Sequence, residues 1–321
     1  MAEIFYKSFA YQFEPLMHIR LTSDIYDNID ALLKQQHPYW IHFEKPSKNL
    51  QQQLIKRLNI PKAIHTILLA DESRPRCVKF DDDYVLIIQG IQPSVMTSDE
   101  DIPSLRFWIT PQGLLSLSTG KVQAIDDLQL NIKNLLDPTP LLCLTTLLEY
   151  VIGYTEDSSY QIDEELNKIE ADFKYMDETT INIMNVRQNI IFLRRYILPQ
   201  RDALIVLANK LENIPIGMKN TFKELSDSML RQVETIEMLR ERAMVIQDNV
   251  TNQIGDISNR RMYLLTIVML IFTPAFFIMG LFSMYMPVPG MNSKFTWWGI
   301  TTFIIVLSVG LFVLFKKKKW L

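Results

Sequence analysis

The sequence predicts an α/β cytoplasmic domain joined by a long helical stalk to two C-terminal transmembrane helices. Short β-rich runs alternate with amphipathic stretches up to about residue 125, and apolar spacings of 3 and 4 take over after it. Residues 218–283 contain no proline except Pro274, so one very long helix is expected there. Two uncharged windows, 263–283 and 296–315, are each long enough to cross a bilayer.

Charge is divided unevenly along the 321 residues. The last 59 residues contain no Asp or Glu and five Lys, so the first 262 carry all 36 acids against 28 Lys and Arg, a net charge of −8. An acidic soluble part without a basic, aromatic-containing stripe argues against nucleic acid as a partner. The two cysteines, Cys77 and Cys143, lie far apart, which argues against a disulfide framework and a thiolate metal site and favours a reducing compartment.

Residues 1–127 are expected to form the α/β cytoplasmic domain. Runs rich in β-branched and aromatic residues predict strands at 40–43, 63–70, 84–91, 105–110 and 114–117. Amphipathic spacing predicts helices at 28–36 and 47–58.

Residues 128–216 are expected to form a helical cytoplasmic part, because strand patterns disappear there. Helices are predicted at about 128–153 and about 158–210, the second with a break near 177–180. Pro215 and Gly217 mark the start of the third helix. At ~1.5 Å per residue that helix makes a rod of about 100 Å, so its soluble part, 217–262, must be a stalk.

The membrane region is expected to follow the stalk directly. It consists of transmembrane helix 1 at 263–283, an outer loop at 284–295, transmembrane helix 2 at 296–315 and a basic tail at 316–321. Arg260 and Arg261 precede the first span and four lysines follow the second, whereas the loop holds only Lys294. By the positive-inside rule both termini of this multi-pass protein face the cytoplasm. The first residues lack a basic region followed by an apolar run, so no signal peptide is expected.

Two faces of the third helix repeat at spacings of 3 and 4. The first is apolar and predicts packing along one seam: Phe222, Leu225, Met229, Val233, Ile236, Leu239, Ala243, Ile246, Val250, Ile254 and Ile257. The second passes from polar positions into the membrane: Asp248, Asn252, Gly255, Asn259, Met262, Thr266, Met269, Thr273, Phe276, Gly280 and Ser283. The second face lines a pore if several copies bundle around it. Otherwise it consists of solvent-facing stalk positions and of lipid-facing or packing positions.

These features resemble the CorA superfamily of divalent cation transporters. The resemblance rests on two C-terminal spans with a short outer loop, the long helix before them, the α/β domain and the ending Lys-Lys-Lys-Lys-Trp-Leu at 316–321. Within the superfamily, Arg74-Pro75-Arg76, the segment Pro-Ser-Leu-Arg-Phe-Trp at 103–108 and the segment Leu-Arg-Arg-Tyr-Ile-Leu-Pro-Gln-Arg-Asp-Ala-Leu at 193–204 are similar to the zinc-transporter branch known as ZntB. The resemblance covers nearly the whole chain. It implies a CorA-like homopentamer whose pore is formed by the first span of each subunit.

The superfamily carries a Gly-Met-Asn signature just after the first span, and this sequence departs from it. An ungapped count from Pro274 puts the signature at Ser283, Met284 and Tyr285. A literal Gly-Met-Asn occurs later, at Gly290, Met291 and Asn292. We favour 283–285 as the filter, because residues 280–282 resemble the lead-in to the motif and residues 288–290 resemble the loop after it. Residues 290–292 are then a secondary filter candidate.

The same register, together with the second face, gives the expected pore lining. Its members are Asp248, Asn252, Asn259, Met262, Leu265, Thr266, Thr273 and Gly280. Amide and hydroxyl oxygens can guide a hydrated divalent cation, and rings of Met262 and Leu265 form an apolar collar that closes by dewetting. Asp248, the one candidate for direct contact with metal, concentrates negative charge at the inner mouth unless it is simply a solvated stalk residue.

We therefore expect a non-enzymatic transporter of Zn²⁺ or Mg²⁺, with no cofactor and with the bilayer and further copies of itself as partners. Neither span contains His, Cys, Asp or Glu, so the ion passes hydrated. A magnesium channel of the CorA type is one alternative. A non-conducting membrane-anchored sensor or scaffold is another, favoured by the missing Asn at 285 and an outer loop without acids.

Two other groups of residues have a structural and a functional interpretation. All four histidines lie in the α/β domain, and an ordinary structural role is expected for them, His37 and His42 beside Trp40 included. Residues 156–178 hold nine acids and two lysines. They form a solvated helix tip or collect cations near the pore mouth.

Overall fold

The computed structural model describes residues 8–13, 16–20, 25–34, 37–70, 74–91, 102–171, 176–212, 214–283 and 294–317. The chain divides into two compact units, Met1–Gln247 and Asp248–Leu321. Helix α7 (Ile216–Ser283) contributes residues to both units.

The first unit is built around a seven-stranded sheet with the strand order β2-β1-β3-β7-β6-β5-β4. The strands are β1 (Ser8–Gln12), β2 (Met17–Arg20), β3 (Tyr39–Glu44), β4 (Arg76–Phe80), β5 (Asp83–Gln89), β6 (Ser104–Ile109) and β7 (Gly113–Ser118). Neighbouring strands are antiparallel except β3 and β7, which are parallel, with His42 opposite Ser116. Two antiparallel halves therefore meet at one parallel seam.

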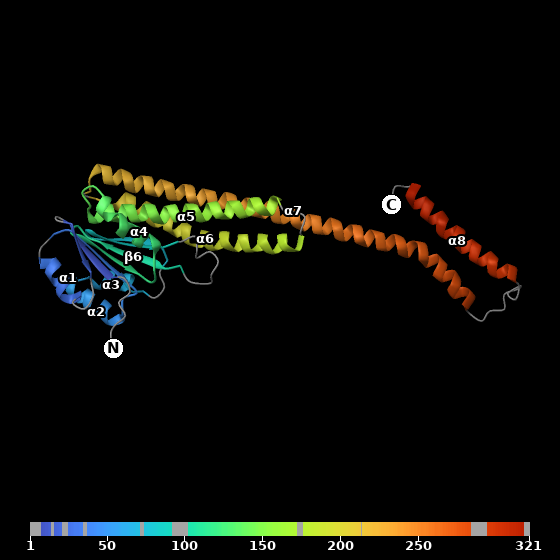
Figure 1. The fold of residues 1–321 in the computed structure, drawn as a ribbon, viewed down its shortest axis with the longest axis horizontal. Coiled ribbons are helices and arrows are strands. Elements are labelled where there is room, and N and C mark those ends of the chain that lie inside the picture. Colours follow the sequence, from blue (N-terminus) through green and yellow to red (C-terminus); the bar gives the residue numbers. More distant parts are fainter. Residues whose placement is uncertain are drawn as a thin grey trace. The chain divides into compact units, whose positions relative to one another are not determined.

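Three short helices cover one face of this sheet: α1 (Ile25–Lys34), α2 (Lys48–Arg57) and α3 (Lys62–Leu68) (Figure 1). Helix α2 begins where the Ser47 hydroxyl accepts a hydrogen bond from the Leu50 amide at 3.3 Å, a typical N-cap. Leu54 of α2 and Ile64 of α3 belong to the same buried cluster as Ile41 of β3. The alternation of apolar residues along the strands thus places half of their side chains against these helices.

Three further helices cover the opposite face: α4 (Gln123–Asn131), α5 (Pro140–Ala171) and α6 (Met176–Lys210), with a 3₁₀ turn at Ile132–Asn134. Helix α6 packs on β4 and β5, and α5 packs on β7. The Tyr84 hydroxyl of β5 donates a hydrogen bond to the Lys210 carbonyl at 2.6 Å, which fixes the end of α6 to the sheet. The sheet is therefore the middle layer of three.

Four predicted strands are confirmed as β3, β5, β6 and β7, and the strand predicted at 63–70 is wrong. That segment is α3, whose Ile64 and Leu68 are each 1% exposed. Its apolar residues recur four positions apart, and this helical spacing prevailed over the β-branched composition. Strands β1, β2 and β4 were not predicted. β4 and β2 are the two edge strands of the sheet. An edge strand is less enclosed than a central one, so its sequence carries a weaker apolar pattern.

The helices predicted after residue 127 need three corrections. The helix expected at 128–153 is two helices, because Pro138 and Pro140 separate α4 from α5 and Asp137 between them has a positive φ of 47°. Helix α5 continues through the gap expected at 154–157. The predicted break near 177–180 is displaced: α5 ends at Ala171 and α6 begins at Met176, so residues 177–180 already lie inside α6.

The long third helix is confirmed as α7, and its apolar seam is buried over most of its length. The buried members are Phe222, Leu225, Met229, Val233, Ile236, Leu239, Ala243, Ile246 and Val250. The seam continues at the same spacing to Ile254 and Ile257, which are 41% and 40% exposed. The apolar pattern that predicts packing therefore continues to residues that remain exposed to solvent in a single chain.

The second unit contains the apolar part of α7 and helix α8 (Lys294–Lys317). An 18-residue window in each helix has a mean hydropathy of 2.4 or 2.3, and 11% or none of that window is buried. A helix in the core of a soluble protein would be mostly buried, whereas these two expose their apolar side chains. By length and composition, both can cross a membrane.

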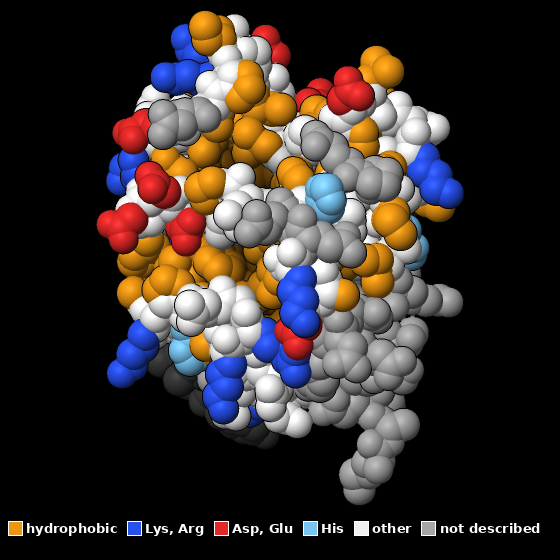
Figure 2. Space-filling view, turned by 90° about the vertical axis from the view of Figure 1, so that its left-hand side faces the viewer, with side chains coloured by type: hydrophobic (Ala, Val, Ile, Leu, Met, Phe, Trp, Pro, Cys, Tyr) orange, Lys and Arg blue, Asp and Glu red, His pale blue; other side chains and the backbone are white. Residues whose placement is uncertain are grey.

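The visible end of the first unit has a mixed surface (Figure 2). Figure 2 shows hydrophobic side chains between separate Lys or Arg and Asp or Glu side chains, and neither sign of charge dominates the described residues in this view.

Candidate ion pathway on helix α7

The eight predicted pore residues lie within one sector of α7. At about 100° per residue the sector from Leu265 to Asn252 covers roughly 140° of the helix circumference. All eight are exposed in the single chain, with Met262 at 63% and Leu265 at 57%. The sector runs from the polar residue Asp248 to Gly280 in the apolar part, all within the second unit.

The less exposed residues of the apolar part lie on the other side of the helix. They are Ile267, Ile271, Pro274, Ala275 and Ile278. Ile267 and Ala275 are 7% and 8% exposed, and their midpoint is roughly 180° from the centre of the predicted pore sector. The packed face and the predicted pore face of α7 are therefore opposite one another.

Two threonines give the sector outward-facing acceptor oxygens. The Thr266 hydroxyl donates a hydrogen bond to the Met262 carbonyl at 2.9 Å, and the Thr273 hydroxyl donates one to the Met269 carbonyl at 2.6 Å. Each hydroxyl hydrogen is thus engaged by its own helix, while the lone pairs of the oxygen stay available. A row of such oxygens can accept hydrogen bonds from the water shell of a cation.

Of the two filter candidates, only the first contains a residue whose backbone the structure describes. Ser283 is the last residue of α7, and its side chain lies outside the described residues. Met284, Tyr285 and the literal Gly-Met-Asn at 290–292 also lie outside them.

Part of the acidic region 156–178 is neutralised by one arginine of α7. The Arg242 guanidinium donates to an Asp163 carboxylate oxygen at 2.6 Å, to the Asn167 side-chain oxygen at 2.7 Å and to Glu170 at 3.2 Å. These bonds hold the pKa of Arg242 above its usual value, and the hydrogen bonding to the Glu170 carboxylate has the largest effect. The cluster therefore fastens α5 to α7. Sequence reasoning missed it, because Arg242 is 79 positions from Asp163.

The segment at 193–204 also has a packing role. Arg194 of α6 forms a salt bridge with Glu237 of α7, and hydrogen bonding from Arg194 lowers the pKa of that carboxyl. Gln200, 1% exposed, accepts a hydrogen bond from the Gln89 amide of β5 at 3.1 Å. This segment therefore connects α6 both to the sheet and to α7.

One histidine and both cysteines of the first unit have surroundings that do not suit zinc binding. His42 is 2% exposed, and its Nδ1 lies 2.9 Å from Ser116 Oγ, which also accepts a hydrogen bond from Trp40 Nε1 at 2.8 Å. Burial raises the pKa of both thiols, Cys77 and Cys143, to about 12, so neither is a thiolate at neutral pH. Among the described residues, no three or more His, Cys, Asp or Glu side chains are grouped to hold a metal ion.

Fold and site together define a protein with a layered α/β unit, two helices long and apolar enough to cross a membrane, and an exposed, partly polar face on the first of them. Residues 35–317 match the family described as CorA-like Mg²⁺ transporter protein. The sequence is 24% identical over 294 residues to the zinc transport protein ZntB of Pectobacterium atrosepticum, covering 90% of each chain. The chain belongs to the CorA family, in its ZntB-like branch.

Solved structures have the same fold. The complete structure of the CorA magnesium transporter from Methanocaldococcus jannaschii is similar with a TM-score of 0.81 and 19% identity, over 99% of this chain and 100% of that one. The cytoplasmic domain of ZntB from Vibrio parahaemolyticus is similar with a TM-score of 0.65 and 22% identity, over 78% of this chain and 99% of that domain. The likeness extends to α7 and α8 as well as to the α/β unit, because the first of these structures covers nearly the whole chain.

Proposed function

We propose that this protein is a homopentameric transporter that moves hydrated Zn²⁺ or Mg²⁺ across the inner membrane through a pore lined by α7. The observation that carries the proposal is the exposed sector from Asp248 to Gly280, opposite the packed residues Ile267 and Ala275. Membership of a transporter family and the zinc named for its ZntB relatives support a divalent cation as the cargo.

Several copies of the chain are needed to enclose such a path. One helix presents its polar sector on one side only, so a closed ring requires the same sector from neighbouring copies. The exposed seam residues Ile254 and Ile257 support this assembly, because they continue a packing pattern whose partners must come from another chain. Five copies is the number that the resemblance to the CorA superfamily implies.

Each part of the sector has a proposed role. Five Asp248 carboxylates concentrate cations at the inner mouth, and Asn252 and Asn259 offer amide oxygens to the hydrated ion. Rings of Met262 and Leu265 form the apolar collar that closes the path by dewetting. Thr266 and Thr273 then supply the acceptor oxygens described above, and the small residue Gly280 leaves the path wide before the filter at 283–285.

The ion keeps its water shell in this proposal. Amide and hydroxyl oxygens suit a hard, hydrated cation, whereas direct zinc binding would call for imidazole or thiolate ligands. The sequences of both spans contain neither. The arginines before the first span and the lysines after the second support a cytoplasmic location for both termini.

Metal uptake into proteoliposomes tests the proposal. The full chain is reconstituted, its oligomeric state is measured by native mass spectrometry, and uptake of Zn²⁺, Mg²⁺, Co²⁺ and Ni²⁺ is followed with and without a proton gradient. Uptake of Zn²⁺ or Mg²⁺ by a pentamer, blocked by modification of the α7 sector, is the expected result.

The second candidate is a non-conducting sensor or scaffold of the same fold. It is favoured by Tyr285 in place of the signature Asn and by an outer loop without acids. An assembled pentamer that binds divalent cations and takes up none of the four would establish this candidate and exclude transport.

A further inference from the structure

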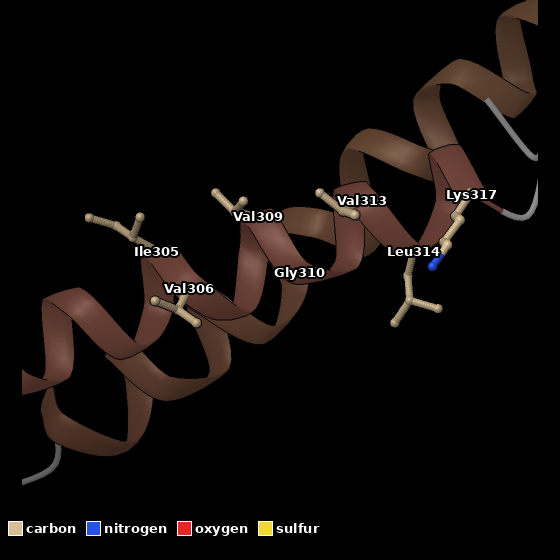
Figure 3. Close-up of a pocket in the computed structure, with 7 residues that line it drawn as sticks. All are labelled: Ile305, Val306, Val309, Gly310, Val313, Leu314 and Lys317. Carbon is tan, nitrogen blue, oxygen red and sulfur yellow. The ribbon is translucent and has the colours of Figure 1, made fainter.

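An exposed apolar strip runs along the second half of α8 and ends in a cation (Figure 3). It lines an open hollow of about 740 Å³ and consists of Ile305, Val306, Val309, Gly310, Val313, Leu314 and Lys317. The hollow is far larger than the ~30 Å³ that one water molecule takes up. Val306, Gly310, Val313 and Lys317 recur at spacings of 4, 3 and 4, so they follow one line along the helix.

The strip faces away from the better-packed side of α8. The less exposed residues of α8, among them Ile304, Leu311 and Phe315, lie roughly 160° around the helix from it. Val306 is 63% and Val313 53% exposed. A side chain added at Gly310 would meet nothing within 4 Å, so this residue leaves a notch in the middle of the strip.

The dimensions of the strip suit one lipid leaflet. From Ile305 to Lys317 it extends about 18 Å at ~1.5 Å per residue, and one leaflet contributes about 15 Å of the ~30 Å hydrocarbon core. The Lys317 ammonium therefore lies at headgroup depth when the apolar residues face an acyl chain. In the sequence Lys317 is one of four consecutive lysines, and such clusters beside a span attract anionic lipids.

We propose that this strip binds an anionic phospholipid, with one acyl chain in the notch at Gly310 and the lipid phosphate at Lys317. A second copy of the chain suits the strip less well, because a packed neighbouring helix would desolvate Lys317 without offering it an anion. The proposal requires α8 to lie in the membrane and does not depend on which cation is moved, or on whether any is.

Native mass spectrometry of the purified full chain tests this with phosphatidylglycerol and phosphatidylcholine of identical acyl chains. We expect phosphatidylglycerol to be retained about fivefold better, since one lysine near a charged headgroup contributes about 1 kcal/mol. Lys317→Gln should weaken this preference and Lys317→Arg should keep it. Lys294→Gln, which removes the same charge from the other end of α8, is the matched control and should change nothing.

The notch has its own test. Gly310→Leu should weaken retention of both lipids, whereas Gly299→Leu, which adds the same side chain to α8 outside the strip, should not. Equal retention of the two lipids by the unmodified chain, or equal losses in Lys317→Gln and Lys294→Gln, would overturn the proposal. So would a high yield of disulfide between copies carrying Val306→Cys, because a second copy would then cover the strip. Each readout is independent of ion flux.

Discussion

The Arg242 guanidinium of α7 lies 2.6 Å from the Asp163 carboxylate of α5, and the same arginine also reaches Asn167 and Glu170. One side chain thus fastens two helices that are far apart in the sequence. Because its partners are acids of the region 156–178, the tip of α5 is held by charge pairing as well as by packing.

Replacing this arginine should loosen α5 from α7. Arg242→Ala is expected to cost about 1 kcal/mol, since the groups are partly exposed and solvent screens them, and to lower the melting temperature by roughly 2–4 °C. Thermal unfolding of the detergent-solubilised chain measures this, and high salt should shrink the difference. Arg240→Ala is the matched control, because Arg240 pairs with Glu237 of its own helix. Equal losses in the two variants would contradict a clamp between helices.

The buried Ser116 hydroxyl should matter far more than its neighbour on the same strand. Ser116→Ala removes the partner of Trp40 Nε1 and His42 Nδ1 and should cost about 1–3 kcal/mol. Ser118 is also buried, but its Oγ has no hydrogen-bond partner among the described residues. Ser118→Ala should therefore be neutral or slightly stabilising. Thermal unfolding of both variants tests the contrast, and similar losses would count against the network.

Cysteine accessibility should separate the proposed pore face from the rest of α7. Cysteines at Asn259, Thr266 or Thr273 are expected to react with a small hydrophilic thiol reagent and block uptake. Cysteines at Leu264, which is exposed, and at Ile271, which is partly buried, lie outside the sector and should leave uptake intact. Equal blockade at both sets would remove the pore assignment.

The proposed apolar collar predicts a leak when it is made polar. Met262→Ser should raise the resting cation leak severalfold, because a hydroxyl ring stays wet where a thioether ring dries. Leak is measured in proteoliposomes with pentamer content checked in parallel, and Met262→Leu serves as the apolar control. An unchanged leak in an assembled Met262→Ser variant would place the gate elsewhere.

The two filter candidates make opposite predictions. Ser283 ends α7 on the helical line through Thr273 and Gly280, whereas Gly290 follows Pro287 and Pro289, which stop any helix. Restoring the family pattern by Ser283→Gly with Tyr285→Asn should therefore keep or improve uptake, and Asn292→Ala should be nearly silent. Uptake lost in an assembled Asn292→Ala variant and unaffected by changes at 283 and 285 would make the literal Gly-Met-Asn the filter.

Sequence patterns predicted α7 and the apolar part of α8 well and several other elements less well. α7 and the apolar part of α8 follow from runs of twenty or more residues, over which one periodicity or one composition dominates. α3 has seven residues and a composition typical of a strand, and the four-residue spacing of Ile64 and Leu68 was too short a pattern to predict a helix that packs on the sheet. β4 contains two basic residues in five and gains its place by pairing with β5.

Some features of the candidate site could also be predicted from the sequence, and others could not. The shared face of Asp248, Asn259 and Thr273 is a property of one helix, so spacing alone could predict it. Arg242 and Gln200 form hydrogen bonds with elements far away in the sequence, and no local sequence pattern predicts such partners.

The parallel pairing of β3 with β7 sets the order in which this protein can be made. β7 begins 69 positions after β3 ends, so the first three strands leave the ribosome long before their partner exists. Pairing of two strands across so long a loop is slow. Until β7 pairs with β3, the free edge of β3 can form non-native hydrogen bonds with other strands. Both apolar helices come later still in the chain. The sheet can therefore be complete before either helix emerges, so that a nascent chain reaches the membrane with its soluble unit already folded.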